Sequence, residues 1–182
     1  MPFTFDHVID NQRYLTKLRV DYWLSNSLFS VQWFCLLALL LISWAIAIKL
    51  IDKKNVTDVI LSGLLMLLTL DFLDQIGILS SLWDYQIQLI PIPTGLIAVN
   101  YSLVPVLTML MYQYYPDWRR FLLFSTLLSL VGSTLIEPLL EVFKIYTVIN
   151  WEHYYSFPIY IAIAAIDKMI VDSLVRLRSR TR

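Results

Sequence analysis

Three of the long apolar runs of this chain contain ionisable side chains well inside them. Each run contains one pair that is a candidate for function, namely Asp71 and Asp74, Glu137 and Glu141, and Asp167 and Lys168. In bilayer hydrocarbon an ionised side chain costs about 2.5–3.5 kcal/mol, and residues of this kind usually serve an ion, a proton or a partner. The pairs are therefore candidates for binding a proton, a cation or a small ligand inside a membrane.

Sequence spacing places both members of each acidic pair on one side of a helix. Asp71 and Asp74 are three residues apart, and Glu137 and Glu141 are four residues apart. Residues at these separations are neighbours on a helix surface. Burial disfavours the charged form of a carboxyl group, whereas a nearby ammonium group favours it. We therefore expect Glu137 to be the central residue of the site, either protonated or paired with Lys168.

Two prolines adjoin polar members of the candidate set. Pro105 lies shortly after Asn100, and Pro138 directly follows Glu137. A proline inside a helix removes a backbone hydrogen bond and kinks the helix, and irregular backbone at membrane depth is tolerated where it lines a cavity or meets other protein groups. We expect two kinked helices, whose freed carbonyl groups either line a cavity or are satisfied by neighbouring side chains.

His153 adds a titratable imidazole to the candidate residues. It lies in the aromatic segment Trp151–Ser156, between two apolar runs, and histidine changes its charge near neutral pH. We expect this segment to lie at the outer membrane surface and to cover the mouth of the cavity. Trp151 itself also fits the role of an interfacial anchor.

The composition indicates that lipid is the solvent for most of the surface. Hydrophobic residues make up 58% of the 182 residues and charged residues only 15%, and the mean hydropathy is +0.66. Soluble domains contain about 25% charged residues. Because the formal net charge is zero, we expect no nucleic acid partner. No Gly/Ser-rich linker divides the chain, so we expect one domain spanning residues 1–182.

Five apolar runs must position these residues, and each is near or above the roughly 20 residues that cross a bilayer core. The runs lie near residues 28–51, 56–83, 96–115, 121–145 and 159–175. In residues 1–26, apolar residues recur at helical spacing among charged ones, which predicts a short amphipathic helix in the interface plane or packed on the bundle mouth. The expected fold is all-α, a polytopic membrane bundle of five transmembrane helices.

Lysine and arginine residues are distributed unevenly between alternate loops. Nine of them fall on one side, namely Lys49, Lys53, Lys54, Arg119, Arg120, Arg176, Arg178, Arg180 and Arg182. Four fall on the other side, namely Arg13, Lys17, Arg19 and Lys144. Short cytoplasmic loops are enriched in lysine and arginine. We therefore expect a multi-pass protein of the cell membrane with its N-terminus outside and its C-terminus in the cytoplasm.

This orientation assigns a depth to each candidate residue. With a rise of about 1.5 Å per helical residue, Asp71, Asn100 and Glu137 come out in the outer half of the membrane. Asp167 and Lys168 come out close to the middle by the same rise of about 1.5 Å. Lys168 also stands four residues before Asp172, a spacing that favours a local ion pair between them.

The second half of the chain contains several residues and short motifs that resemble those of a known family. They are Asn100 with Pro105, the run Tyr112–Tyr114, the pair Glu137-Pro138 and the run Trp151–Ser156. On these landmarks the chain resembles a family of small multipass membrane proteins from spore-forming Gram-positive bacteria, to which no activity is assigned. The resemblance implies a bacterial cell membrane, and it carries no catalytic assignment to any residue.

Three classes of function stay open at this point. The first is a transporter-like or sensor-like protein whose outward-facing polar pocket binds a small ligand, a proton or a cation. The second is a membrane-embedded lipid or isoprenoid enzyme, in which the carboxylates bind magnesium and a diphosphate or donate a proton. The third is an accessory subunit whose polar residues contact a partner membrane protein. The pattern names no cofactor and does not decide between an enzyme and a binding protein.

Overall fold

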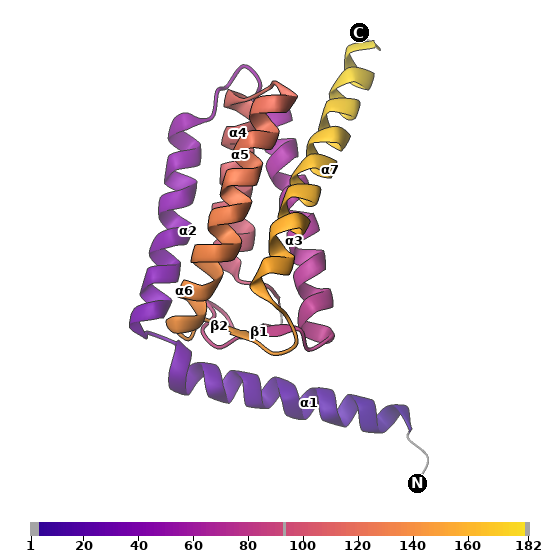
Figure 1. Ribbon diagram of the computed structural model, residues 1–182. Helices are drawn as coiled ribbons and strands as arrows, with labels where there is room; N and C mark the ends of the chain where they lie inside the picture. The colour runs from indigo at the N-terminus through magenta and orange to yellow at the C-terminus, as the bar shows by residue number, and fades with distance from the viewer. Residues whose placement is uncertain (1–3, 93, 181–182) are drawn as a thin grey trace.

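The computed structural model describes residues 4–92 and 94–180, and helices dominate its architecture (Figure 1). The elements in chain order are α1 (Phe5–Tyr22), η1 (Trp23–Ser27), α2 (Val31–Leu50), α3 (Val56–Leu79), β1 (Trp83–Tyr85), η2 (Val99–Leu103), α4 (Val104–Tyr114), α5 (Trp118–Val131), η3 (Gly132–Ile136), α6 (Glu137–Val142), β2 (Tyr146–Val148) and α7 (His153–Arg180). The η elements are π-helical segments. Residues 1–3 of the predicted N-terminal segment, and Arg182 of the basic set, lie outside the described residues.

The long helices form an antiparallel bundle, and α1 lies across one end of it (Figure 1). Helix α2 runs away from that end, α3 returns to it, α4 runs away again, α5 with α6 returns, and α7 runs away to the C-terminus. Helix α3 packs against α4 and α7, and α5 packs against α7. The prediction of an all-α fold is confirmed. We call the end crossed by α1 the α1 end.

The two ends of the bundle differ in charge. The α2–α3 turn, the α4–α5 turn and the last part of α7 meet at the end opposite α1 (Figure 1). These segments carry most of the predicted basic set, namely Lys49, Lys53, Lys54, Arg119, Arg120, Arg176 and Arg178. Arg178 forms an ion pair with Asp58 at this end, with a closest distance of 2.8 Å. We call it the basic end. The lysine and arginine residues that the sequence assigns to one side of the membrane therefore lie at one end of the bundle.

Three helical segments of the described chain are long and apolar enough to cross a membrane, rather than the five that the sequence predicts. They are Val31–Leu50, Val56–Leu79 and Trp118–Val142. The run near 96–115 is divided between a π-helical segment and an α4 of only 11 residues. The run near 159–175 lies in α7, where three charged residues interrupt it: Asp167, Lys168 and Asp172. The bundle therefore contains five helical passages, of which three have the length and hydropathy of a membrane span.

A π-helical segment precedes each proline that the sequence predicts to disturb a helix. Segments η2 and η3 end just before the short helices that carry Pro105 and Pro138 in their first turn. Pro105 cannot donate to the carbonyl of Tyr101, because proline lacks an N–H group. The indole of Trp44 donates to that carbonyl instead, over 3.2 Å. The carbonyl of Tyr101 is therefore satisfied by a neighbouring side chain.

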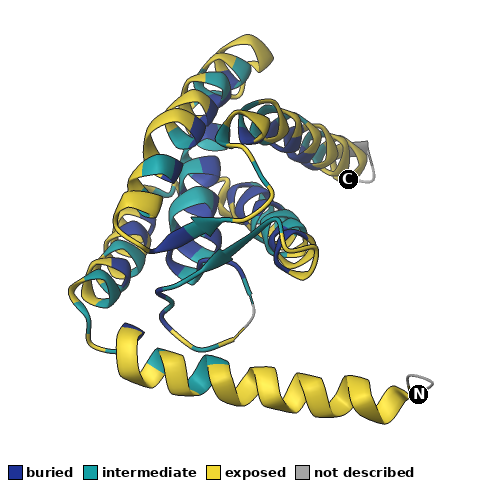
Figure 2. Cartoon of the chain, turned by 60° about the horizontal axis from the view of Figure 1, so that its bottom comes forward, coloured by how far each residue is buried: buried dark blue, intermediate teal, exposed yellow. Residues whose placement is uncertain are grey.

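A short antiparallel sheet, which the sequence analysis does not predict, joins the segments that follow α3 and α6. Trp83 lies opposite Val148 in this pair of strands, and Tyr85 lies opposite Tyr146. The strands come from distant segments of the chain, and we call the antiparallel pair β1–β2 the hairpin only as a short name. Figure 2 shows the sheet among the helix ends at the α1 end. Helix α3 ends at Leu79 and α6 ends at Val142, so the predicted runs 56–83 and 121–145 extend beyond the helices. Aromatic and β-branched residues in these two segments favour a strand.

The predicted N-terminal helix is confirmed as α1, and it contains no buried residue (Figure 2). Two contacts near its C-terminal end attach this part of the chain to the bundle. The guanidinium of Arg19 pairs with Asp84 of β1 at 2.9 Å, and the indole of Trp23 donates to the carbonyl of Gln88 over 2.8 Å. Most of α1 is therefore exposed, and its last turn is held next to the hairpin.

An apolar core fixes the long loop between β1 and η2. Leu36 of α2 packs with Ile87, Leu89 and Leu96 of this loop and with Ile145 beside β2. Each of these side chains is at most 9% exposed. The loop is therefore packed against the helices, and this packing holds its neighbours Gly95 and Asn100 in place.

Candidate functional site

Glu137, the first residue of α6, contacts three side chains of α7. Its Oε2 atom lies 2.9 Å from Nδ1 of His153 and accepts a hydrogen bond from the hydroxyl of Ser156 over 3.1 Å. Its Oε1 atom accepts a hydrogen bond from the hydroxyl of Tyr160 over 2.5 Å. Glu137 is buried, so both of its oxygens depend on these partners.

The imidazole of His153 lies between two carboxyl groups. Its Nδ1 atom contacts Glu137, and its Nε2 atom lies 3.1 Å from Oε2 of Glu141. A neutral imidazole carries one N–H group and one lone pair, so it can donate to only one carboxylate. Two short N···O contacts therefore require one additional proton, either on the ring or on a carboxyl group. We call Glu137, His153 and Glu141 the Glu–His–Glu triad.

The surroundings of His153 favour its protonated form. Burial lowers the pKa of His153. The hydrogen bonds to Glu137 and Glu141 and their negative charges together raise it by more, so the net shift is upward from 6.5. The side chain of His153 is 25% exposed, so the imidazole is not fully enclosed by the protein. The two carboxylates therefore raise the pKa of His153 above its ordinary value.

Asp74 of α3 binds side chains from two other elements. Its Oδ1 atom accepts hydrogen bonds from the indole of Trp83 over 2.7 Å and from the hydroxyl of Tyr85 over 2.9 Å, both in β1. Its Oδ2 atom accepts a hydrogen bond from the amide of Asn100 over 2.5 Å, in η2. Asp74 and Asn100 are both buried. Asp74 therefore ties the hairpin and η2 to α3.

Gly95 packs directly against the pair formed by Asp74 and Asn100. A Cβ atom at this position would overlap Oδ2 of Asp74 and Nδ2 of Asn100. Glycine is the residue that allows such a close approach of the backbone. The loop before η2 therefore closes over the buried carboxylate.

Tyrosine residues of the hairpin lie between the Asp74 network and the triad. The rings of Tyr85 and Tyr146 are 5.5 Å apart, and the ring of Tyr146 is 6.2 Å from the imidazole of His153. Burial raises the pKa of Tyr146, and the charges of Glu137 and then Asp74 raise it further. Glu137 of the triad and Asp74 therefore both influence the buried phenol of Tyr146. We treat the triad and the Asp74 network as one polar region next to the hairpin.

Two other candidate residues, Asp71 and Asp167, have hydrogen-bond partners outside the triad and the Asp74 network. Asp71 accepts hydrogen bonds from the hydroxyl of Tyr101 over 2.6 Å and from the amide of Gln75 over 2.9 Å. It is Asp74, and not Asp71, that contacts Asn100. Asp167 is buried on α7 and accepts a hydrogen bond from Thr69 over 3.2 Å.

Lys168 is not the partner of Glu137, so of the two states expected for Glu137, protonated or paired with Lys168, the pairing does not form. Its ammonium lies 3.4 Å from a carboxylate oxygen of Asp172. Three aromatic rings surround it at 4.7 to 5.4 Å from their centroids, those of Tyr112, Phe121 and Trp118. A carboxylate and aromatic faces satisfy a buried ammonium, so the local pair with Asp172, which the spacing favours, is the one that forms.

The predicted lid segment Trp151–Ser156 is mostly helical, because α7 begins at His153. The indole of Trp151 donates to the hydroxyl of Ser156 over 3.0 Å and so closes the start of the helix. The ring of Trp151 also contacts that of Trp83, with centroids 5.0 Å apart. Trp151 of this segment therefore packs on β1 beside the polar region, and its role as a lid stays a prediction.

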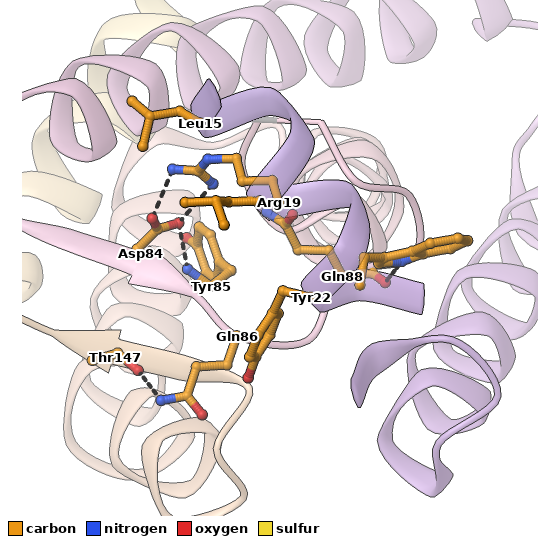
Figure 3. A pocket seen from close by; sticks show the side chains of 10 residues that line it. Leu15, Arg19, Tyr22, Asp84, Tyr85, Gln86, Gln88 and Thr147 are labelled. Atoms are coloured by element: carbon orange, nitrogen blue, oxygen red, sulfur yellow. Dashed lines mark hydrogen bonds and ion pairs between the residues drawn. The ribbon is translucent and has the colours of Figure 1, made fainter. Parts of the chain in front are cut away.

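A pocket of about 390 Å³ opens between α1 and the hairpin (Figure 3). Arg19 and Tyr22 of α1 face Asp84, Tyr85 and Thr147 of the hairpin across it (Figure 3). No member of the triad lines this pocket. It shares one residue with the Asp74 network, because the hydroxyl of Tyr85 donates to Asp74. A ligand in the pocket would therefore contact the hairpin next to the polar region.

Sequence reasoning missed the hydroxyl partners of the acidic residues and the glycine that packs on them. His153, Ser156 and Tyr160 stand three and seven residues apart on one helix, a spacing that places them on one face and could have suggested the group. Tyr85 and Gly95 lie in a strand and a loop, and no local pattern places them next to Asp74.

Among residues 4–92 and 94–180, no three histidine, cysteine, aspartate or glutamate side chains are grouped so as to hold a metal ion. Searches with the whole chain find no matching protein family, curated protein or solved structure. A function for the chain therefore has to be inferred from its own geometry.

Proposed function

We propose that this chain is a multipass membrane protein that binds protons from the outer side of a cell membrane, in a sensor-like or transporter-like role. The Glu–His–Glu triad carries the proposal. Its two N···O contacts, at 2.9 and 3.1 Å, need one proton more than a neutral imidazole and two carboxylates supply. Proton binding is therefore the chemistry that the arrangement supports best.

Loss of the proton changes the triad in a defined way. One nitrogen of His153 then presents a lone pair to a carboxylate, and that contact becomes repulsive. Glu137 is held by Ser156 and Tyr160, whereas the side chain of Glu141 is 47% exposed and is able to turn toward water. Because α6 leads into β2, the opening of the Glu141 contact acts on the hairpin and on the pocket beside it.

We propose five membrane crossings with the α1 end outside and the basic end in the cytoplasm. The three apolar spans run alongside η2–α4 and α7 in one bundle (Figure 1), and the cationic side chains gather at the basic end. Short cytoplasmic segments are enriched in lysine and arginine. In this orientation α1 lies in the outer interface, the triad faces the outside, and the bilayer is the partner of the exposed apolar side chains.

Reporter fusions test this orientation. An enzyme that is active only in the cytoplasm is expected to be active when fused after Lys54, after Arg120 or after the C-terminus, and inactive when fused after Asp84. A reporter that is active only outside should give the opposite pattern. Cytoplasmic activity at Asp84 would contradict the orientation and, with it, access of outside protons to His153.

The dependence of stability on pH tests the proposed proton binding. A group whose pKa is raised on folding stabilises the folded protein fully below its unfolded pKa, and this stabilisation is lost as the pH rises through the folded pKa. The pKa of His153 is raised from 6.5. We therefore expect the Tm of the wild-type protein in micelles to exceed that of His153→Gln at pH 6 by more than it does at pH 8.

The second histidine provides the control. The chain contains only two histidines, and His7 lies near the exposed start of α1. His7→Gln should leave the pH dependence of the Tm as it is in the wild type. An equal difference between the wild type and His153→Gln at both pH values would contradict proton binding by the triad.

A further inference from the structure

Asp167 is a buried carboxyl group that the triad does not use. It lies on the same buried face of α7 as Tyr160, two helical turns closer to the basic end, at a distance along the axis of roughly 10 Å. Ile163 and Ala164 lie between these residues and pack in an apolar cluster with Met66 of α3. This apolar layer separates Asp167 from the proton that the triad binds.

The two oxygens of Asp167 have unequal surroundings. Oδ1 accepts one hydrogen bond, from the hydroxyl of Thr69, whereas Oδ2 is buried and has no hydrogen-bond partner. The adjacent ammonium of Lys168 does not help, because it pairs with Asp172 and sits among three rings. Asp167 is only 3% exposed. An ionised Asp167 would therefore carry a buried negative charge with a single donor.

Such a charge is unfavourable, and a proton removes it. Burying an ionised carboxylate without a partner costs far more than burying a neutral carboxylic acid, and such groups take up a proton instead. A protonated Asp167 still accepts the hydrogen bond from Thr69, and it buries no net charge. We infer that Asp167 is a second proton-binding site, a carboxylic acid that holds its proton inside the bundle.

This second site extends the proposed function. Helix α7 would bind one proton at His153, near the α1 end, and another at Asp167, deep in the bundle, with an apolar layer between them. A role for Asp167 in passing protons rests on the proposed function, whereas its protonated state does not. The two claims can therefore fail separately: His153 can titrate as expected even if Asp167 is ionised.

A lipid-soluble carbodiimide tests the protonated state directly. A carboxylic acid adds across a C=N bond of the reagent, its proton goes to nitrogen, and the O-acylisourea rearranges to a stable N-acylurea. We expect dicyclohexylcarbodiimide to modify Asp167 in the full-length protein in micelles, as located by fragment mass spectrometry. A permanently charged, water-soluble carbodiimide should leave Asp167 unmodified, because the residue is enclosed in the bundle.

Two variants show whether the adduct is on Asp167 and whether it depends on the proton of this residue. Asp167→Asn should lose this adduct, while adducts on other residues persist. Thr69→Val removes the one donor to Oδ1, so the modification of Asp167 should persist to a higher pH than in the wild type. The inference is overturned if the folded wild-type protein gives no adduct on Asp167, or if Thr69→Val abolishes the adduct without loss of helical circular dichroism.

Discussion

Replacement of Gly95 by alanine is expected to lower the free energy of unfolding by about 1–3 kcal/mol, the usual effect of forcing atoms into a packed interior. The new methyl group would overlap the carboxylate of Asp74 and the amide of Asn100. Asp74 and Asn100 are both buried, and they are hydrogen-bonded to each other. Moving either one breaks a buried hydrogen bond, which adds about 1–3 kcal/mol if a group is left unsatisfied.

Gly132 provides a matched control in the same protein. A Cβ atom there would meet only the ring of Tyr160, at 3.7 Å, which is an ordinary van der Waals contact. Gly132→Ala should therefore unfold close to the wild type in urea or on heating in micelles, while Gly95→Ala unfolds earlier. Equal stability of the two variants would show that the loop before η2 does not close over Asp74.

Replacement of Glu137 by glutamine is expected to reduce strongly the additional stability of the protein at pH 6 relative to pH 8. Without the charge of Glu137, the pKa of His153 falls toward its ordinary value, because one of the two groups that raise it is lost. The new amide nitrogen would also face His153 and Ser156 on one side or Tyr160 on the other. If the facing nitrogen or hydroxyl is already donating and does not reorient, the amide is left as a buried donor without an acceptor, which costs about 1–3 kcal/mol.

Glu141→Gln separates the loss of pH dependence from the cost of a buried amide donor. The side chain of Glu141 is about half exposed and contacts only the Nε2 atom of His153 among the members of the triad. This variant should reduce the pH dependence of the Tm and leave the stability at pH 8 close to that of the wild type. Glu137→Gln protein with the full pH dependence of the wild type would mean that Glu137 supports the helix at Pro138 and has no part in proton binding.

Helical hydrophobic periodicity and charge distribution predicted the parts of the fold that depend on local pattern. The runs of apolar residues located α2, α3 and α5 with α6, and the lysine and arginine counts grouped residues that lie together at the basic end. The interruptions at Pro105 and Pro138 were also predictable, because proline lacks a backbone donor. Their form, a π-helical segment before each proline, depends on how each helix packs.

Long-range packing determined the parts that the sequence did not predict. The strands β1 and β2 are each three residues long and pair across about sixty residues of chain, and such short strands are too brief for a periodic signal. Their pairing places Tyr85 against Asp74. The partner of Lys168 could be predicted in part from its four-residue spacing to Asp172, but the partner of Glu137 depended on where α7 begins.

The titration of His153 by nuclear magnetic resonance tests proton binding by the triad most directly. In His7→Gln protein, labelled with ¹⁵N-histidine, the two ring nitrogens of His153 give the only imidazole signals. We expect a midpoint above 6.5, the ordinary pKa of histidine, which moves down when Glu137 or Glu141 is replaced by glutamine. A midpoint at or below 6.5 that neither replacement changes would contradict proton binding by the triad.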